Sequence, residues 1–111
     1  MRVNFYHTNS GRSPVEDFIE ALSKADQARF AEVLVGLSEF GLSYARVTFK
    51  PLRGKLWEIK FQAPGGGYRM AYVMVEQDSM VILHAFRKST QKTPIKDLDL
   101  AEKRMKEVLD I

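Results

Sequence analysis

Lysine and arginine side chains are the residues of this chain whose types and spacing could do chemistry. Residues 46–96 hold ten basic and three acidic residues, whereas residues 1–45 and 97–111 each have a net charge of −2. The candidates follow one another along a stretch of apolar runs: Arg53, Lys55, Lys60, Arg69, Arg87, Lys88 and Lys92. Because the positive charge is concentrated, it indicates a partner that carries phosphate groups.

Each of these cations also has a plainer interpretation as a solvated surface charge, which is the default for any single lysine. Arg69 differs, because Tyr68 and residues 70–72 surround it with apolar neighbours. An arginine in that setting needs an anion, a carboxylate partner such as Glu58, or a route to solvent. Arg69 is therefore the strongest functional candidate, and an ion pair with Glu58 is the alternative.

The aromatic residues among these cations leave two interpretations open. Tyr68 and Tyr72 could stack on the bases of single-stranded RNA, or they could be core or edge residues of a sheet. Trp57 is most simply a core residue. His84 lies in an apolar run, where a hydrogen-bonded core histidine is more common than a catalytic one.

Several classes of site are disfavoured by composition. The chain has no cysteine, and its two histidines, His7 and His84, are too far apart in sequence to suggest a zinc site. Neither a zinc-protease helix motif nor a phosphate-binding glycine loop is present, and residues 65–67 read as a hairpin turn. We therefore expect no metal and no cofactor. Without an apolar run of membrane-spanning length or a signal peptide, we also expect no membrane association and a cytoplasmic location.

The first part of the chain predicts a short strand and a helical hairpin. Residues 2–6 alternate polar and apolar side chains, as in a strand. Ser13 followed by Pro14 is typical of a helix start, and a second helix is expected to begin after Ser23 and end at Gly41.

The second part predicts a sheet followed by one helix. Strands are expected at about 46–52 merging into 55–62, at 68–76 and at 80–88, with hairpin turns between the last three. Thr93 and Pro94 then begin a final helix, whose apolar stripe includes Ile95. The fold class is α+β, with one domain over residues 1–111: a small antiparallel sheet packed against the N-terminal helical hairpin and the C-terminal helix.

This order of elements, with three short motifs, resembles the RelE/ParE superfamily of bacterial toxins. The motifs are Leu52-Arg53-Gly54, Tyr68-Arg69 and the run from Phe86 to Pro94. The chain is similar in particular to the phage-related HigB-like branch, and the resemblance covers nearly its whole length. It implies the toxin of a type II toxin–antitoxin system, an endoribonuclease that cleaves mRNA in the decoding site of the ribosome without a metal. Its implied partners are the ribosome, mRNA and a HigA-like helix-turn-helix antitoxin.

The resemblance also assigns residues by position. The strand lysine of the family falls on Lys60, the arginine of the Tyr-Arg pair on Arg69, and a basic residue at the end of the last strand on Arg87 or Lys88. The chain departs from RelE in having Glu58 where RelE has a second lysine. It also lacks a clear counterpart of the terminal tyrosine of RelE, a space that Lys92 could partly fill.

A mechanistic hypothesis follows from these assignments. Crowding by other cations disfavours the charged form of a lysine, so Lys60 is the expected general base. Arg69 is the expected phosphate clamp, and Lys88 with Lys92 supplies further stabilisation or the acid. The expected RNA or ribosome contacts are Arg53, Lys55, Tyr68, Tyr72 and Arg87.

Two other functions fit the same sequence. ParE-like members of the superfamily share the fold but inhibit DNA gyrase through protein contacts. A non-catalytic RNA- or ribosome-binding module would use the same cations without cleaving anything, and its binding would weaken with salt as contacts are lost.

Overall fold

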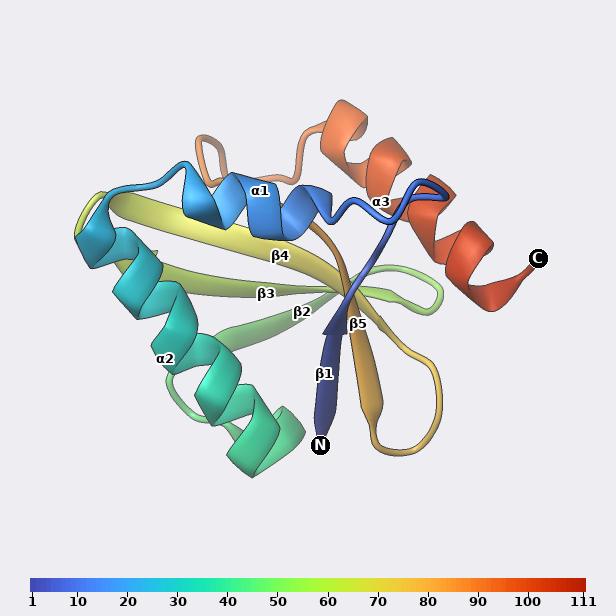
Figure 1. The fold of residues 1–111 in the computed structure, drawn as a ribbon, viewed down its shortest axis with the longest axis horizontal. Coiled ribbons are helices and arrows are strands. Elements are labelled where there is room, and N and C mark those ends of the chain that lie inside the picture. Colours follow the sequence, from blue (N-terminus) through green and yellow to red (C-terminus); the bar gives the residue numbers. More distant parts are fainter.

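The structure, a computed structural model, describes residues 1–111 and places a twisted sheet between helices (Figure 1). The elements in chain order are β1 (Arg2–Phe5), α1 (Pro14–Glu20), α2 (Lys24–Phe40), the short 3-10 helix η1 (Gly41–Ser43), β2 (Thr48–Arg53), β3 (Leu56–Ala63), β4 (Gly66–Met74), β5 (Ser79–Arg87) and α3 (Ile95–Leu109). This confirms the predicted α+β class and the predicted order of elements.

Local signals in the sequence fix the ends of the first two helices. The hydroxyl of Ser13 accepts a hydrogen bond from the Glu16 amide, and that of Ser23 accepts one from the Asp26 amide. Such caps satisfy amides that have no partner within a helix. Gly41 ends α2 with φ +58°, a conformation that glycine adopts without steric cost. The predicted helix starts and the predicted stop are confirmed.

The sheet has five strands in the order β1-β5-β4-β3-β2. The three hairpin pairings are antiparallel as predicted, and the turn before Gly66 puts Lys60 opposite Arg69. β1, however, pairs with β5 in parallel, with Arg2 opposite Ser79. The sheet is therefore mixed, not purely antiparallel, because α1 and α2 carry the chain away from β1 before the hairpins begin.

Each face of the sheet is covered by its own helices, which creates two hydrophobic cores. Phe30 and Leu37 of α2 pack with Ile59 and Met70 on one face, and Met105 of α3 packs with Val73 and its neighbours on the other. β4 lies at the centre, so every residue from 68 to 73 is buried. This explains why the sequence of β4 shows no alternation of polar and apolar residues.

Two expected core residues lie partly at the surface. Trp57 is 37 % exposed and Ile95, the first residue of α3, is 63 % exposed. Trp57 is on β3, next to the edge strand β2, so no further strand lies beyond β2 to cover its side chain. None of the three α-helices is both long and apolar enough to cross a lipid bilayer.

Candidate nucleic-acid interface

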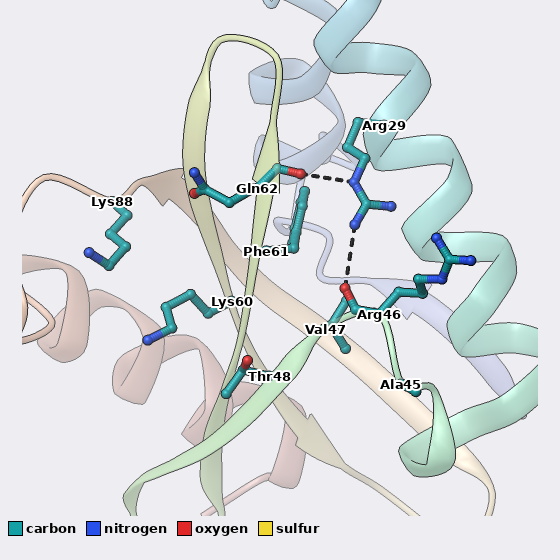
Figure 2. Close-up of a pocket in the computed structure, with 9 residues that line it drawn as sticks. All are labelled: Arg29, Ala45, Arg46, Val47, Thr48, Lys60, Phe61, Gln62 and Lys88. Carbon is teal, nitrogen blue, oxygen red and sulfur yellow. Dashed lines mark hydrogen bonds between the residues drawn. The ribbon is translucent and has the colours of Figure 1, made fainter.

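A hollow of about 550 Å³ lies at the edge of the sheet where β2 begins, and four cations line it. Its lining consists of Arg29, Ala45, Arg46, Val47, Thr48, Lys60, Phe61, Gln62 and Lys88 (Figure 2). No carboxylate is among these residues, and none of the four cations forms an ion pair. By contrast, Arg2, Arg12, Arg53 and Arg69 each pair with a carboxylate elsewhere. The hollow, called the basic hollow below, thus gathers four uncompensated positive charges.

Lys60 and Lys88 extend to the same side of this hollow, away from the two arginines (Figure 2). Gly67 makes their proximity possible. It lies opposite Gln62 in the sheet, and its carbonyl accepts a hydrogen bond from the Lys88 amide at 2.9 Å. A Cβ atom at this position would come within 2.5 Å of the Gln62 side-chain oxygen and 3.4 Å of the Lys88 Cβ. The missing side chain therefore lets Lys88 lie against β4, close to β3.

Arg69 does not reach the hollow, because its side chain is only 1 % exposed. Its Nη2 donates hydrogen bonds to the main-chain oxygens of Thr90 and Gln91, at 2.8 and 2.7 Å. Its Nε lies 3.6 Å from Oε2 of Glu58, which is equally buried. The predicted phosphate clamp is thus corrected, since a phosphate cannot reach a guanidinium that is buried and occupied by the chain itself. The alternative, an ion pair with Glu58, is confirmed.

The buried pair instead anchors the loop that connects β5 to α3. This loop, residues 88–94, carries Lys88 and Lys92. The hydroxyl of Thr93 donates a hydrogen bond to Oε1 of Glu58 at 2.6 Å, next to the two carbonyls that Arg69 holds. Within the loop, the Thr90 hydroxyl donates to the main-chain oxygen of Lys92 at 2.5 Å. Arg69 and Glu58 are therefore positioning residues for the two loop lysines.

Tyr68 and Tyr72 cannot stack on RNA bases, which corrects the second expectation. Their exposed fractions are 0 % and 3 %, and both face the core beneath α1 and α2, opposite the side to which Lys60 extends. Burial raises the pKa of Tyr72 to about 12. Of the two interpretations left open by the sequence, the core interpretation is correct for both residues.

Three further predicted contacts lie away from the basic hollow. Arg53 forms ion pairs with Asp99 and Glu102 of α3, at 3.3 and 3.1 Å, and Lys55 is in the same turn between β2 and β3. This turn is at the end of β3 opposite the glycine turn. Arg87 lies over the ring of Tyr68 at 4.9 Å, on the opposite face from Lys60, and donates a hydrogen bond to the Gly65 carbonyl. The structure does not bring these residues together with Lys60 and Lys88.

His84 is a hydrogen-bonded structural residue, as the more common interpretation suggested. Its Nε2 lies 2.7 Å from Oδ1 of Asp97 at the start of α3, and its ring stacks on Phe86 at 4.9 Å. Burial lowers the pKa of His84, against the opposing hydrogen bond with Asp97. The contact joins α3 to β5, the two elements that the loop of residues 88–94 connects.

Asp26 fixes the glycine turn that borders the interface. Its carboxylate accepts hydrogen bonds from the Tyr68 hydroxyl at 2.5 Å and the Gly65 amide at 2.8 Å. Gly65 is required there, because a Cβ atom would come within 2.3 Å of the carboxylate. The bond from Tyr68, followed by the bond from Gly65, lowers the pKa of Asp26 below its usual 3.8.

We expect Asp26→Asn to destabilise the protein in a pH-dependent way. A lowered folded-state pKa gives a contribution that is present above the unfolded value and is lost as pH falls through the folded value. Urea unfolding of both proteins should therefore show a lower midpoint for Asp26→Asn near neutral pH. The gap should close as the pH falls below about 4. A gap that stays constant over this range would show that the carboxylate charge does not matter.

Sequence reasoning missed Arg29 and Arg46. Arg29 is on α2 within an acidic segment, and Arg46 is the first residue of the basic stretch, outside any apolar run. No spacing rule relates a helix residue to the start of β2, because only the packing of α2 on the sheet brings them together. The four cations at the hollow can hold anionic oxygens, and the lysine amines can also exchange protons.

A comparison with models of known protein families places most of the chain in one family. Residues 17–106 fit the model of a family described as "Phage derived protein Gp49-like (DUF891)". The matched range begins within α1 and ends within α3, so it contains every lining residue of the basic hollow. No curated protein matches the chain.

Proposed function

We propose that this chain, which belongs to the phage-derived Gp49-like family, is a toxin that cleaves mRNA in the decoding site of the ribosome. The family has the RelE/ParE-like toxin fold and is related to the RelE and HigB toxins. One observation carries the nuclease proposal: Lys60 and Lys88 extend without ion pairs from one side of a hollow that no carboxylate lines. A site of this kind suits a reaction whose transition state gains negative charge.

The reaction uses the 2′-hydroxyl of the RNA itself as the nucleophile. A base removes the hydroxyl proton, and the 2′-oxygen forms a bond to the neighbouring phosphorus. The bond between phosphorus and the 5′-oxygen breaks, and the leaving oxygen takes up a proton. The products are a 2′,3′-cyclic phosphate and a free 5′-hydroxyl. The residues must therefore supply a base, an acid and stabilisation of the extra negative charge on the phosphorane.

Lys60 is the proposed general base. It is half-buried on β3, its amine is free of ion pairs, and the residues that line the hollow with it include three further cations and no anion. Lys88 stabilises the phosphorane from the same side of the hollow (Figure 2). Lys92, exposed on the same loop as Lys88, is the proposed acid or a second stabiliser. Arg69 and Glu58 act indirectly, by holding the loop that presents these two lysines.

The ribosome supplies what the chain lacks. Two or three lysines can stabilise charge, but the chain offers no exposed aromatic ring in the hollow that could orient a nucleotide, because Phe61 is only 5 % exposed. Holding the reactive groups in line accounts for much of the rate of such reactions. An mRNA already fixed in the decoding site would meet this requirement.

The same proposal implies a cytoplasmic protein with a cognate antitoxin. A HigB-like toxin of a type II system would have a small HigA-like helix-turn-helix partner that silences it. Co-expression with such a partner should restore growth of cells that the chain alone arrests.

Induced expression separates the proposed activity from its rivals. Incorporation of labelled amino acids should stop within minutes while DNA damage signalling stays at its basal level. DNA damage signalling with continued translation would point to gyrase inhibition, as in ParE-like proteins. Arrest of translation with intact mRNA would point to a module that binds the ribosome without cleaving. A catalytically impaired Lys60→Met variant should arrest neither process.

A further inference from the structure

Two hydrogen bonds hold the Arg29 side chain at the edge of the sheet. β2 begins at Thr48, opposite Lys60, so β3 continues beyond this point without a partner on that side. Arg29 fills the gap from α2. Its Nε donates a hydrogen bond to the carbonyl of Gln62 at 2.8 Å, and its Nη2 donates to the carbonyl of Arg46 at 3.4 Å (Figure 2). Because a guanidinium has five N–H donors, others remain available to a ligand.

Arg46 lies beside Arg29 and has an exposed side chain. Its carbonyl is held by Arg29, but its guanidinium makes no hydrogen bond or ion pair within the chain. Glu32 and Glu39 line the next groove along α2 together with both arginines, yet neither carboxylate forms an ion pair with them. The two arginines are therefore adjacent cations without ion-pair partners.

The geometry points to a second phosphate-binding site at Arg29 and Arg46, which holds the mRNA strand at a phosphate neighbouring the cleaved one. The inference rests on the proposed function. The lysines extend to one side of β3 and the arginines lie on the other (Figure 2). A single strand that crosses the sheet edge would contact them in succession. The Thr48 hydroxyl and the Gln62 amide also line the hollow and can donate hydrogen bonds to the strand.

This site recognises the sugar–phosphate backbone, not the bases. Sequence-tolerant binding of bases relies on exposed aromatic rings, and the one ring at the hollow, that of Phe61, is buried against Phe30 at 4.9 Å. Contacts to phosphate fix position without reading sequence. The arginines would therefore set the register of the strand over Lys60, and any codon preference would come from other contacts.

The test compares Arg46→Ala with Arg2→Ala. Arg2 serves as the matched control. It is an exposed arginine paired with Glu76, on the edge strand β1, which is at the opposite edge of the sheet from the hollow. Neither change removes a buried contact, so thermal unfolding of both variants should match that of the wild type. On programmed ribosomes, Arg46→Ala should raise KM for mRNA cleavage roughly tenfold. The slope of log affinity against log salt should become shallower by about 0.7. Arg2→Ala should change neither quantity.

A second assay separates this site from the nuclease activity itself. Binding of a short single-stranded RNA to the isolated protein, followed by fluorescence anisotropy, requires no cleavage. If Arg46→Ala binds RNA more weakly but the wild type cleaves no mRNA, the phosphate site is supported and the nuclease proposal is refuted. Cleavage with identical parameters in Arg46→Ala and Arg2→Ala would overturn the phosphate site alone. Equal loss of affinity for empty and programmed ribosomes would also overturn it, because the ligand would then be ribosomal RNA. The phosphate site would likewise be overturned if the wild type bound RNA neither in the anisotropy assay nor on programmed ribosomes.

Discussion

Replacing Arg69 with alanine is expected to lower the free energy of unfolding by about 3–5 kcal/mol. The change leaves the Glu58 carboxylate buried without its counter-charge, and it removes the donors that Thr90 and Gln91 accept from. A charge left alone in the interior costs far more than the original pair contributes. Urea unfolding followed by circular dichroism measures the effect directly, since the change should move the midpoint without altering the slope.

A double substitution of Arg69 and its partner Glu58 distinguishes a positioning role of Arg69 from direct contact with RNA. Glu58→Gln combined with Arg69→Met removes both charges, so the double variant should be less destabilised than the sum of the two single changes. It should still cleave poorly, because the loop that carries Lys88 and Lys92 has lost its anchor. An Arg69→Ala protein that is as stable as the wild type yet inactive would contradict the positioning role and restore the phosphate clamp.

Lys60→Met is expected to reduce the rate of cleavage by about 10²- to 10⁴-fold. The side chain is half-buried at the hollow and forms no ion pair, so its loss should change stability by less than about 0.5 kcal/mol. Single-turnover cleavage of mRNA on programmed ribosomes would measure the chemical step separately from binding.

Lys50→Met is the matched control for this experiment. Lys50 is an exposed lysine on β2, pairs in register with Glu58, and so extends from the same face of the sheet as Lys60. It does not line the basic hollow. The control should cleave within a factor of about two of the wild type, as expected when a surface charge is removed away from the site. Equal losses in the two variants would mean that the lysines contribute only general positive charge.

The parts of the fold that local chemistry determines could be predicted from the sequence. Ser13, Ser23 and Gly41 bound the first two helices, and the glycine turn set the register that places Lys60 opposite Arg69. The parallel pairing of β1 with β5 could not be predicted in this way. It depends on how α1 and α2 return the chain to the sheet, and no turn connects the two strands.

The candidate site was predictable in part. Charge and family resemblance pointed to Lys60 and Lys88, which line the same hollow. The environment of Arg69 could not be predicted from the sequence. The loop before α3 covers this side chain, and the loop residues that contact it are more than twenty positions further along the chain. Arg29 escaped notice for a related reason, since its neighbours Gln62 and Arg46 are brought to it only by the packing of α2.

Primer extension on mRNA bound to programmed ribosomes tests the central claim most directly. Ribosomes carrying a defined codon in the decoding site would be incubated with the wild-type chain, with Lys60→Met and with Lys50→Met. The same RNA without ribosomes would be run alongside. The account predicts a new stop within the decoding-site codon for the wild type and Lys50→Met, and no stop for Lys60→Met or for naked RNA. Intact mRNA in the presence of ribosome-bound wild-type protein would contradict it.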